Sequence, residues 1–496
     1  MLAALIAAAG VARLPYLGQA NLSPDAADYL NIARHLARGE GFVHSIKWHF
    51  FTSDPIVHSA VGERPPLYPL LLAPLARGSD PARPAQYLTA LLALAAIALG
   101  AAWARRIALP PAAAVAGAAV LAFNPGFLIC SVYPWSEPLY LCELFAVLLV
   151  VGSDAGSRRR AAAAGVLTAL AFFTRPSAPA IVAALALWYL RRRAWRPLAL
   201  YLATLLVLLI PWWALTWSVR GNPFYSLPKF HLVVGDIREG MAAGYGATFP
   251  GPAEFFLANA GTILAKIGRQ TIAYLQMLLG PTYLALLSAF LFLRPFRGRE
   301  ETGREGPWVA VALFHFVLPA LTWATFDGIR FMLPCFAVLV FPLAAEMERA
   351  AGGLATARAR RLAWASLLGV LALLYAVQWG QQQARVRGHA PANRAMRVAR
   401  WQFAPLSPPG ASVATSDPFQ INYWLDRPAI VLPAADSPAW PEKIERFLRE
   451  YRPDSVLLGA EEANGLAPLV RNGRLAPAES IEAMGLRLFR VGRETK

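Results

Sequence analysis

Residues 84–106 read PAQYLTALLALAAIALGAAWARR, a run of twenty-one residues without a charge that ends at Arg105 and Arg106. A helix that crosses a lipid bilayer needs about 20 mostly apolar residues. Further apolar stretches along the chain predict spans in the same way, although two of them are short. The predicted spans are residues 1–18, 84–104, 110–128, 137–153, 161–174, 177–190, 197–218, 271–293, 307–326, 331–347 and 362–380. The sequence therefore predicts a mainly α, polytopic membrane helical bundle with about eleven transmembrane helices.

The composition agrees with a membrane protein. Hydrophobic residues make up 57% of the chain and charged residues 16%, whereas a soluble domain carries about 25% charge. The net charge of +17 does not indicate a nucleic-acid partner, because the arginines lie in short loops between apolar stretches. Three cysteines, Cys130, Cys142 and Cys335, form neither a disulfide framework nor a metal-ligand spacing.

The arginines also predict the topology. They cluster in alternate loops, and the short loops opposite hold only Arg175 and Arg330. Basic loops face the cytoplasm. We therefore expect a multi-pass protein of the plasma (inner) membrane whose extracytoplasmic segments are residues 19–83, 219–270 and the tail after about residue 381. The stretch from Met1 predicts a first span that begins upstream of Met1, with a cleaved signal peptide as the alternative.

The tail differs in kind from the rest of the chain. Strand-like residues 411–415, 429–432 and 455–458 alternate with helix-like residues 417–425 and 440–451. Such alternation is typical of a small α/β domain. The sequence thus predicts a transmembrane domain over residues 1–380 and a soluble extracytoplasmic α/β domain over residues 381–496.

The first loop, residues 19–83, has the densest polar content. Pro24 to Arg38 predicts a helix with Ser23 as its N-cap. Spacings of three and four residues place Asp25, Asp28 and Tyr29 on one face of it. These acids either present a carboxylate pair to a site or only complement the helix dipole.

Three arginines and one further acid are the other candidates. Arg64 precedes Pro65 and either clamps a phosphate or anchors to lipid headgroups. Glu137 opens a span, where it is a functional candidate or a favourable first-turn acid. Arg175 and Arg330 are candidate phosphate ligands, with an Asp327–Arg330 pair as the structural alternative. No histidine motif predicts a metal site.

Five short motifs follow one another along the chain in a characteristic order. They are Asp25-Ala26-Ala27-Asp28-Tyr29, Arg64-Pro65-Pro66-Leu67-Tyr68, Ser136-Glu137-Pro138-Leu139, Thr174-Arg175-Pro176 and Arg330-Phe331-Met332-Leu333-Pro334. Over residues 1–380 this order resembles the GT-C superfamily of membrane glycosyltransferases, in the branch that holds the protein O-mannosyltransferases and the lipid A aminoarabinose transferase.

The resemblance implies transfer of a hexosyl or pentosyl group from a polyprenyl-phosphate sugar to an acceptor hydroxyl on the extracytoplasmic face. The acceptor would be a glycan, a lipid or a protein, and membrane lipid is a further partner. By the same resemblance, Asp25 is the general base. Relatives often carry a second acid next to it, where this chain has Ala26. No cofactor is expected, because arginines can neutralise the leaving phosphate. The implied catalytic acids are Asp25, Asp28 and Glu137, and the implied substrate ligands are Arg64, Tyr68, Arg175 and Arg330.

Three alternatives remain. A polymerase or ligase of lipid-linked oligosaccharides would share the compartment and the type of donor. A membrane transporter or flippase would place its ionisable residues near the bilayer midplane, often in internal repeats, whereas here they gather in loops and at span ends. A non-catalytic relative would keep the fold alone.

Overall fold

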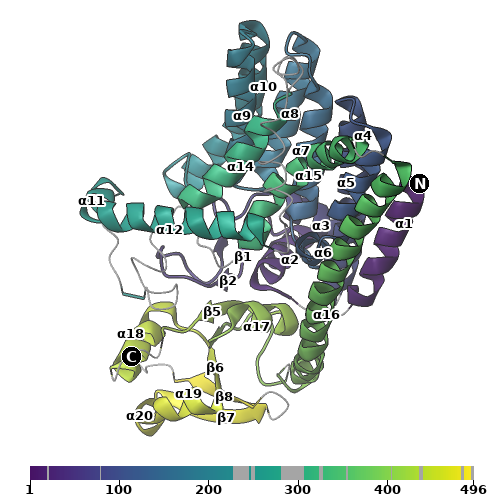
Figure 1. Cartoon of the computed structure of the whole chain (residues 1–496). Coiled ribbons are helices and arrows are strands. Elements are labelled where there is room, and N and C mark those ends of the chain that lie inside the picture. The colour runs from purple at the N-terminus through teal and green to yellow at the C-terminus, as the bar shows by residue number, and fades with distance from the viewer. Residues whose placement is uncertain are drawn as a thin grey trace.

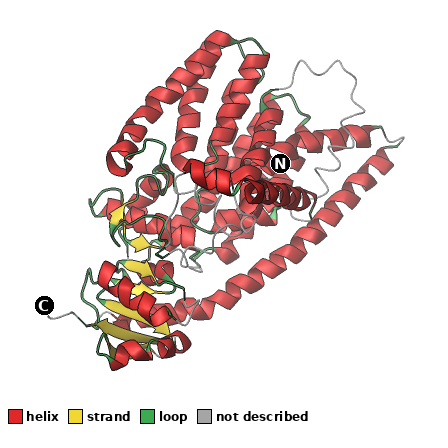
Figure 2. Cartoon of the chain, turned by 90° about the vertical axis from the view of Figure 1, so that its left-hand side faces the viewer, coloured by secondary structure: helices red, strands yellow, loops and turns green. Residues whose placement is uncertain are grey.

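The computed structural model describes residues 1–18, 22–78, 80–226, 245–246, 252–280, 306–322, 328–353, 356–403, 405–434, 439–481 and 485–492. The chain forms a helical bundle and a smaller α/β unit, and one long helix runs between them (Figures 1 and 2). Most of the described elements are helices, which confirms the prediction of a mainly helical chain.

Apolar helices lie side by side in the bundle, which occupies the upper part of Figure 1. Trp103, Phe145 and Phe341 come from three of these helices and meet with their ring centroids 5.8 to 5.9 Å apart. The helices are α1 (Leu2–Arg13), α4 (Ala82–Arg106), α5 (Pro111–Phe123), α6 (Pro125–Val132), α7 (Glu137–Val151), α8 (Arg158–Thr174), α9 (Pro179–Arg191), α10 (Trp195–Arg220), α11 (Pro252–Ala258), α12 (Ala260–Leu279), α14 (Trp308–Thr322), α15 (Gly328–Gly352) and α16 (Ala357–Phe403).

Four helices of the described residues are long and apolar enough to cross a membrane. They are α4, α10, the part of α15 from Ile329 onward and the first part of α16, up to Gln381. Other helices at the predicted spans are shorter, so the expected number of about eleven crossings stays a prediction. The predicted span at 271–293 coincides only with the end of α12, and residues 281–293 lie outside the described part of the chain.

The predicted span at 110–128 is apolar and helical but bent. It consists of α5 and part of α6, which meet at an angle of 60°. The break has a local cause. Asn124 lies between the helices and accepts a hydrogen bond from the backbone N–H of Phe127 through its side chain, while Pro125 opens α6. A capping side chain followed by proline begins a new helix in a new direction.

A buried arginine joins the first helix to this bend. Arg13, fully buried at the end of α1, donates to Ser131 of α6 and to the carbonyl oxygens of Ala9 and Ala122, at 2.8 to 3.1 Å. A buried cation is costly unless its donors find acceptors. Arg13, the one charged residue in the apolar stretch 1–18, therefore has a structural role: it connects α1 to the bend between α5 and α6.

Helix α16 extends from the bundle to the α/β unit. In the bundle, the Trp379 indole donates to the carbonyl oxygen of Phe123 at 3.1 Å, and the Tyr375 hydroxyl accepts from Asn124 at 3.2 Å. At the far end, Phe403 is buried where the helix meets the α/β unit. The proposed domain boundary at residue 381 falls inside this continuous helix.

The first loop folds onto the bundle through short elements. Helix α2 (Pro24–Ala37) begins as predicted, because the Ser23 hydroxyl accepts from the backbone N–H of Ala26. Residues 67–75, directly after the double proline, are also helical. The remaining elements of the loop are β1 (Val43–His44), β2 (Ile46–Lys47), β3 (His58–Ser59), α3 (Leu67–Leu72) and the 3₁₀ helix η2 (Ala73–Leu75).

In the described residues, a six-stranded sheet in the order β2-β5-β4-β6-β8-β7 forms the α/β unit. Strand β2 of the first loop adds to its edge and pairs in parallel with β5. The first loop and the tail therefore fold together. The tail contributes β4 (Val413–Thr415), α17 (Pro418–Leu425), β5 (Ala429–Val431), α18 (Trp440–Tyr451), β6 (Ser455–Gly459), α19 (Ala460–Gly465), α20 (Ala467–Arg471), β7 (Leu475–Ile481) and β8 (Leu486–Val491).

Close packing of α8 on α10 gives a test of the bundle. A Cβ atom added to Gly165 would lie 2.8 Å from the carbonyl oxygen of Tyr201 and 2.9 Å from Cβ of Thr204. We expect Gly165→Ala to lower the free energy of unfolding by about 1–3 kcal/mol, as overpacking does. Thermal unfolding in detergent measures this change.

The matched control is Gly369→Ala in α16, where an added Cβ meets nothing within 4 Å. This variant should gain slightly in stability, because alanine favours the helix by roughly 0.5–1 kcal/mol. Equal stability of the two variants would contradict the close contact of α8 with α10.

Candidate active site at the start of the first loop

The first turns of α2 carry the acids of the site. Asp25 and Asp28 are three residues apart and face the same neighbour, Arg64. The Asp28 side chain is fully buried, whereas a quarter of the Asp25 side chain is exposed. Of the two carboxylates, only Asp25 is open to a ligand.

Arg64 holds both carboxylates at once. Its Nε donates to Asp28 at 2.5 Å, and its Nη2 donates to Asp25 at 2.7 Å. The guanidinium also lies over the ring of Tyr29, with 5.3 Å from Cζ to the centroid. Pro65 and Pro66 follow directly and restrict the backbone at this arginine.

Arg330 approaches from the opposite side, at the start of α15. Its Nη1 donates to the second oxygen of Asp25 at 2.6 Å, and its Nε donates to Glu137 at 2.6 Å. The guanidinium lies 3.8 Å above the ring of Trp135. Asp25 is thus bridged by two arginines from distant parts of the chain. Asp327, the alternative partner of Arg330, lies outside the described residues.

Glu137 joins a third arginine to the same network. Nη1 of Arg175 lies 2.8 Å from the Glu137 oxygen that Arg330 also contacts, and it donates to the Ser136 hydroxyl at 3.1 Å. The Ser136 and Tyr29 hydroxyls are hydrogen-bonded at 3.1 Å. Three acids and three arginines therefore form one continuous ion-pair network that links α2, the residues before α3, α7, the α8–α9 turn and α15.

Tyr68, expected as a substrate ligand, lies beneath this network. Its side chain is fully buried, and its hydroxyl donates to Thr89 at 2.6 Å. Its ring meets the Tyr29 ring edge-on at 5.1 Å. The structure gives Tyr68 a supporting position, because its only polar atom is already paired inside the bundle.

A second group of charged residues extends the network on the far side of Asp28, and the sequence motifs gave no sign of it. His44 hydrogen-bonds to Asp28, and Glu63 contacts both His44, at 3.3 Å, and His58, at 3.0 Å. Arg220 at the end of α10 lies 3.0 Å from Glu63. Glu63 directly precedes Arg64 in sequence, which is the one local signal for its place here.

His44, His58 and Glu63 are also a possible metal-ligand set, since their ligand atoms lie within 4.8 Å of one another. In this arrangement the two imidazoles already contact Glu63, and the Arg220 guanidinium places a positive charge on the same carboxylate. A divalent cation would have to displace those contacts and tolerate that charge. The cluster fits an internal ion-pair network better than a metal site.

The charges of the network set the protonation states of its members. Burial alone would raise the pKa of Asp25 and of Asp28. The charges and hydrogen bonds of Arg64 and Arg330 outweigh burial at Asp25, and those of His44 and Arg64 do so at Asp28, so that both pKa values fall below the usual range. Burial lowers the pKa of His44, but Asp28 and Glu63 raise it further, to about 9. Near pH 7 both carboxylates are ionised and His44 is a cation.

The network is chemically suited to a phosphate ester. An exposed carboxylate lies between two guanidinium groups that can each form paired hydrogen bonds to phosphate. An anion that competes for these arginines would set the carboxylate free, and a free carboxylate can accept a proton.

No model of a known protein family matches the chain, and no curated protein sequence matches it. Solved structures do share its fold. ArnT from Cupriavidus metallidurans, in the apo state, has a TM-score of 0.61 at 16% identity, covering 99% of both chains. The same protein bound to undecaprenyl phosphate gives 0.60.

An oligosaccharyltransferase from Archaeoglobus fulgidus in the apo form has a TM-score of 0.59 at 12% identity, with 94% of this chain and 71% of that chain covered. All these neighbours are members of the GT-C superfamily. The chain therefore has the fold of the GT-C membrane glycosyltransferases, the superfamily that its loop motifs resemble.

Proposed function

We propose that this protein transfers a sugar from a polyprenyl-phosphate carrier to an acceptor hydroxyl. The observation that carries the proposal is Asp25, a partly exposed carboxylate bridged by Arg64 and Arg330. The fold supports it, since ArnT was solved with undecaprenyl phosphate and the Archaeoglobus enzyme AglB with a dolichol-phosphate.

The reaction begins when the donor phosphate competes for the arginines. In the ligand-free arrangement both oxygens of Asp25 are engaged, which makes the carboxylate a weak base. A phosphate that binds Arg64 and Arg330 withdraws those contacts. The pKa of Asp25 then rises toward its ordinary value, so donor binding prepares the base.

The transfer step uses the same groups. Asp25 accepts the proton of the acceptor hydroxyl, and the hydroxyl oxygen forms a bond to the anomeric carbon of the sugar. The bond from that carbon to the phosphate oxygen breaks, and the electron pair leaves with the polyprenyl phosphate. Arg64, Arg330 and Arg175 stabilise this developing charge, while Glu137 holds the latter two arginines in place.

The arginine distribution supports an extracytoplasmic site. On this topology the first loop, the candidate site and the α/β unit all face away from the cytoplasm. The network lies in the first loop and at the ends of α7 and α15, which favours an enzyme over a transporter with midplane charges. An oligosaccharide polymerase or ligase would use the same donor phosphate and differ in the size of the transferred glycan.

A panel of radiolabelled polyprenyl-phosphate sugars tests the proposal directly. Purified protein in detergent is incubated with each donor and with a membrane extract as the source of acceptors. We expect one donor to lose label from the lipid fraction in a protein-dependent manner. Retention of label with every donor, by a protein that stays folded, would contradict a transferase.

The first variant to test is Asp25→Asn. It keeps the shape of the side chain and removes the base, so the transfer rate should fall by about 10²- to 10⁴-fold. The matched control is Asp154→Asn, which alters an exposed ion pair with Arg160 and should leave the rate unchanged. Near-full turnover of Asp25→Asn would rule out this carboxylate as the base.

Asp28→Asn separates a structural role from a catalytic one. Asp28 is buried, and its loss removes the anion that Arg64 and His44 share, so that Arg64 keeps only Asp25 and His44 only Glu63 as an ion-pair partner among the described residues. Breaking a buried pair typically costs about 3–5 kcal/mol. We expect this variant to lower the thermal unfolding midpoint clearly more than Asp25→Asn does. Equal midpoints for the two variants would show that Asp28 is not a buried anchor.

Lysine substitutions test the phosphate ligands. Arg64→Lys and Arg330→Lys keep the charge and lose the second donor of the fork, so the Michaelis constant for the donor should rise by roughly tenfold. Arg160→Lys, on the exposed side of the bundle, serves as the control. Donor constants that match the wild type in both site variants would remove these arginines from the proposed binding site.

A further inference from the structure

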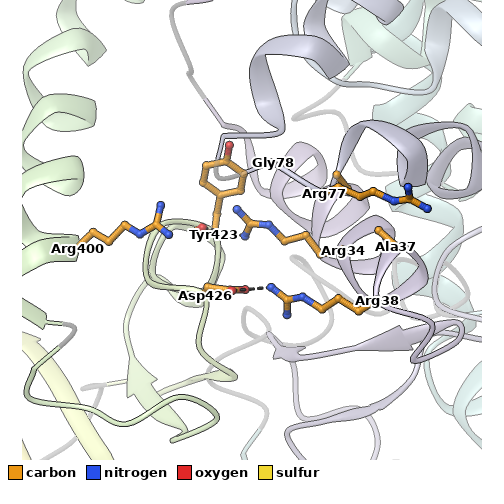
Figure 3. A pocket seen from close by; sticks show the side chains of 9 residues that line it. Arg34, Ala37, Arg38, Arg77, Gly78, Arg400, Tyr423 and Asp426 are labelled. Carbon is orange, nitrogen blue, oxygen red and sulfur yellow. Dashed lines mark hydrogen bonds and ion pairs between the residues drawn. The ribbon is translucent and has the colours of Figure 1, made fainter.

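A basic pocket lies apart from the candidate active site, at the junction of α2, the end of α16 and α17 (Figure 3). It is a cavity of about 170 Å³. Figure 3 shows Arg34 and Arg38 reaching toward Tyr423 and Asp426 from one side and Arg400 from the other. Asp25 and Arg34 are nine residues apart on α2, about 13 Å along its axis and on opposite faces. The pocket is therefore distinct from the Asp25 network.

Positive charge in this pocket exceeds negative charge. Asp426 pairs with Arg38 at 2.6 Å. Arg34 is only 7% exposed, lies 4.5 Å over the Tyr423 ring and donates to the Tyr423 carbonyl oxygen at 2.9 Å, with no ion pair among the described residues. Arg400 is exposed and likewise has no acidic partner in the described part of the chain.

Four arginines line the pocket, and Figure 3 shows that the side chain of one of them, Arg77, points away from Asp426. The other three guanidinium groups around one carboxylate repel one another unless an anion joins them. Burial lowers the pKa of Arg34; Tyr423 and Asp426 oppose this shift, and the nearby Arg38 and Arg400 charges add to it. A ligand with two or more negative oxygens would relieve that repulsion and use the planar donors of arginine in pairs. A phosphate group fits this requirement, and a cavity of about 170 Å³ has room for it.

Tyr423 places the pocket beside the membrane surface. Its hydroxyl accepts from the backbone N–H of Ala82, in the first turn of α4, at 3.1 Å. Helix α4 has 25 residues, a length of about 37 Å, which exceeds the hydrocarbon thickness of about 30 Å. As a membrane span, α4 therefore begins in the headgroup layer, and the pocket that shares Tyr423 lies at the same depth.

We propose that the pocket formed by Arg34, Arg38 and Arg400 binds a phosphate group with two or more negative oxygens, either a free phosphate or the headgroup of an anionic phospholipid at the membrane surface. Binding here is independent of sugar transfer, so this proposal and the proposed function can fail separately. Two substitutions with opposite expected effects test it.

The first substitution is Arg400→Gln, which removes a cation that contacts no acid among the residues that the structure describes. The second is Asp426→Asn, which removes the competing carboxylate from Arg38. Asp426 has a φ of +52°, a left-handed conformation that asparagine tolerates well, so the second variant should fold normally. Arg471→Gln, on the exposed surface of α20, is the control.

The full chain in a neutral detergent is titrated with dioctanoyl phosphatidic acid, with inorganic phosphate and with dioctanoyl phosphatidylcholine, and the rise in thermal unfolding midpoint reports binding. We expect phosphatidic acid to bind roughly tenfold more weakly to Arg400→Gln and several-fold more tightly to Asp426→Asn, with Arg471→Gln unchanged. Phosphate bound at the Asp25 network contributes equally to all four proteins, so the differences among them isolate the pocket.

A rise in the unfolding midpoint with phosphatidic acid alone would identify a lipid headgroup as the ligand. An equal rise with inorganic phosphate would identify a free phosphate group. Both results support the proposal, provided that the two variants shift in opposite directions. Identical affinities for wild type and Arg400→Gln, weaker binding by Asp426→Asn, or equal binding of phosphatidylcholine would each overturn it.

Discussion

The surrounding structure depends on the two ion pairs that Asp25 forms, one with Arg64 and one with Arg330. Its two oxygens are bound by Arg64, from the first loop, and by Arg330, from a helix that lies far along the chain. Charges that are removed from water must be matched by opposite charges and hydrogen bonds at good geometry. The requirement fixes α2 against α15 and, through Glu137, fixes both against α7. A site built in this way is rigid before any ligand arrives, because each charged group orients the next one.

How much of this was predictable from the sequence depends on the range of the contacts. Helix positions follow from local hydrophobic length, and the start of α2 follows from Ser23 and the proline after it. The residues of the network could be named because they stand in short motifs. Their mutual pairing could not, since Asp25 and Arg330 are separated by 305 positions. His44 and Arg220 were missed for the same reason, as neither belongs to a motif and each acquires its role only from tertiary contacts.

Strand β2 shows why a domain boundary is hard to place from sequence alone. It has only two residues, too few to give a pattern of alternating side chains, yet it pairs with β5 and completes the edge of the sheet. Within the first loop, His44, which reaches Asp28, lies two residues before Ile46 of this strand. Short paired segments of this kind connect the bundle to the α/β unit. A displacement of the sheet would therefore also move His44 and, through it, Asp28 of α2.

The length of α16 has an evolutionary consequence. Trp379 fixes the helix to the bend between α5 and α6, and Phe403 is buried against the α/β unit twenty-four residues later, about 36 Å along the axis. One inserted residue would turn everything beyond it by about 100° and advance it by about 1.5 Å. An insertion that restored the rotational phase would still push the sheet away from β2. We therefore expect related chains that keep this β2–β5 pairing to vary in the sequence of this segment and very little in its length.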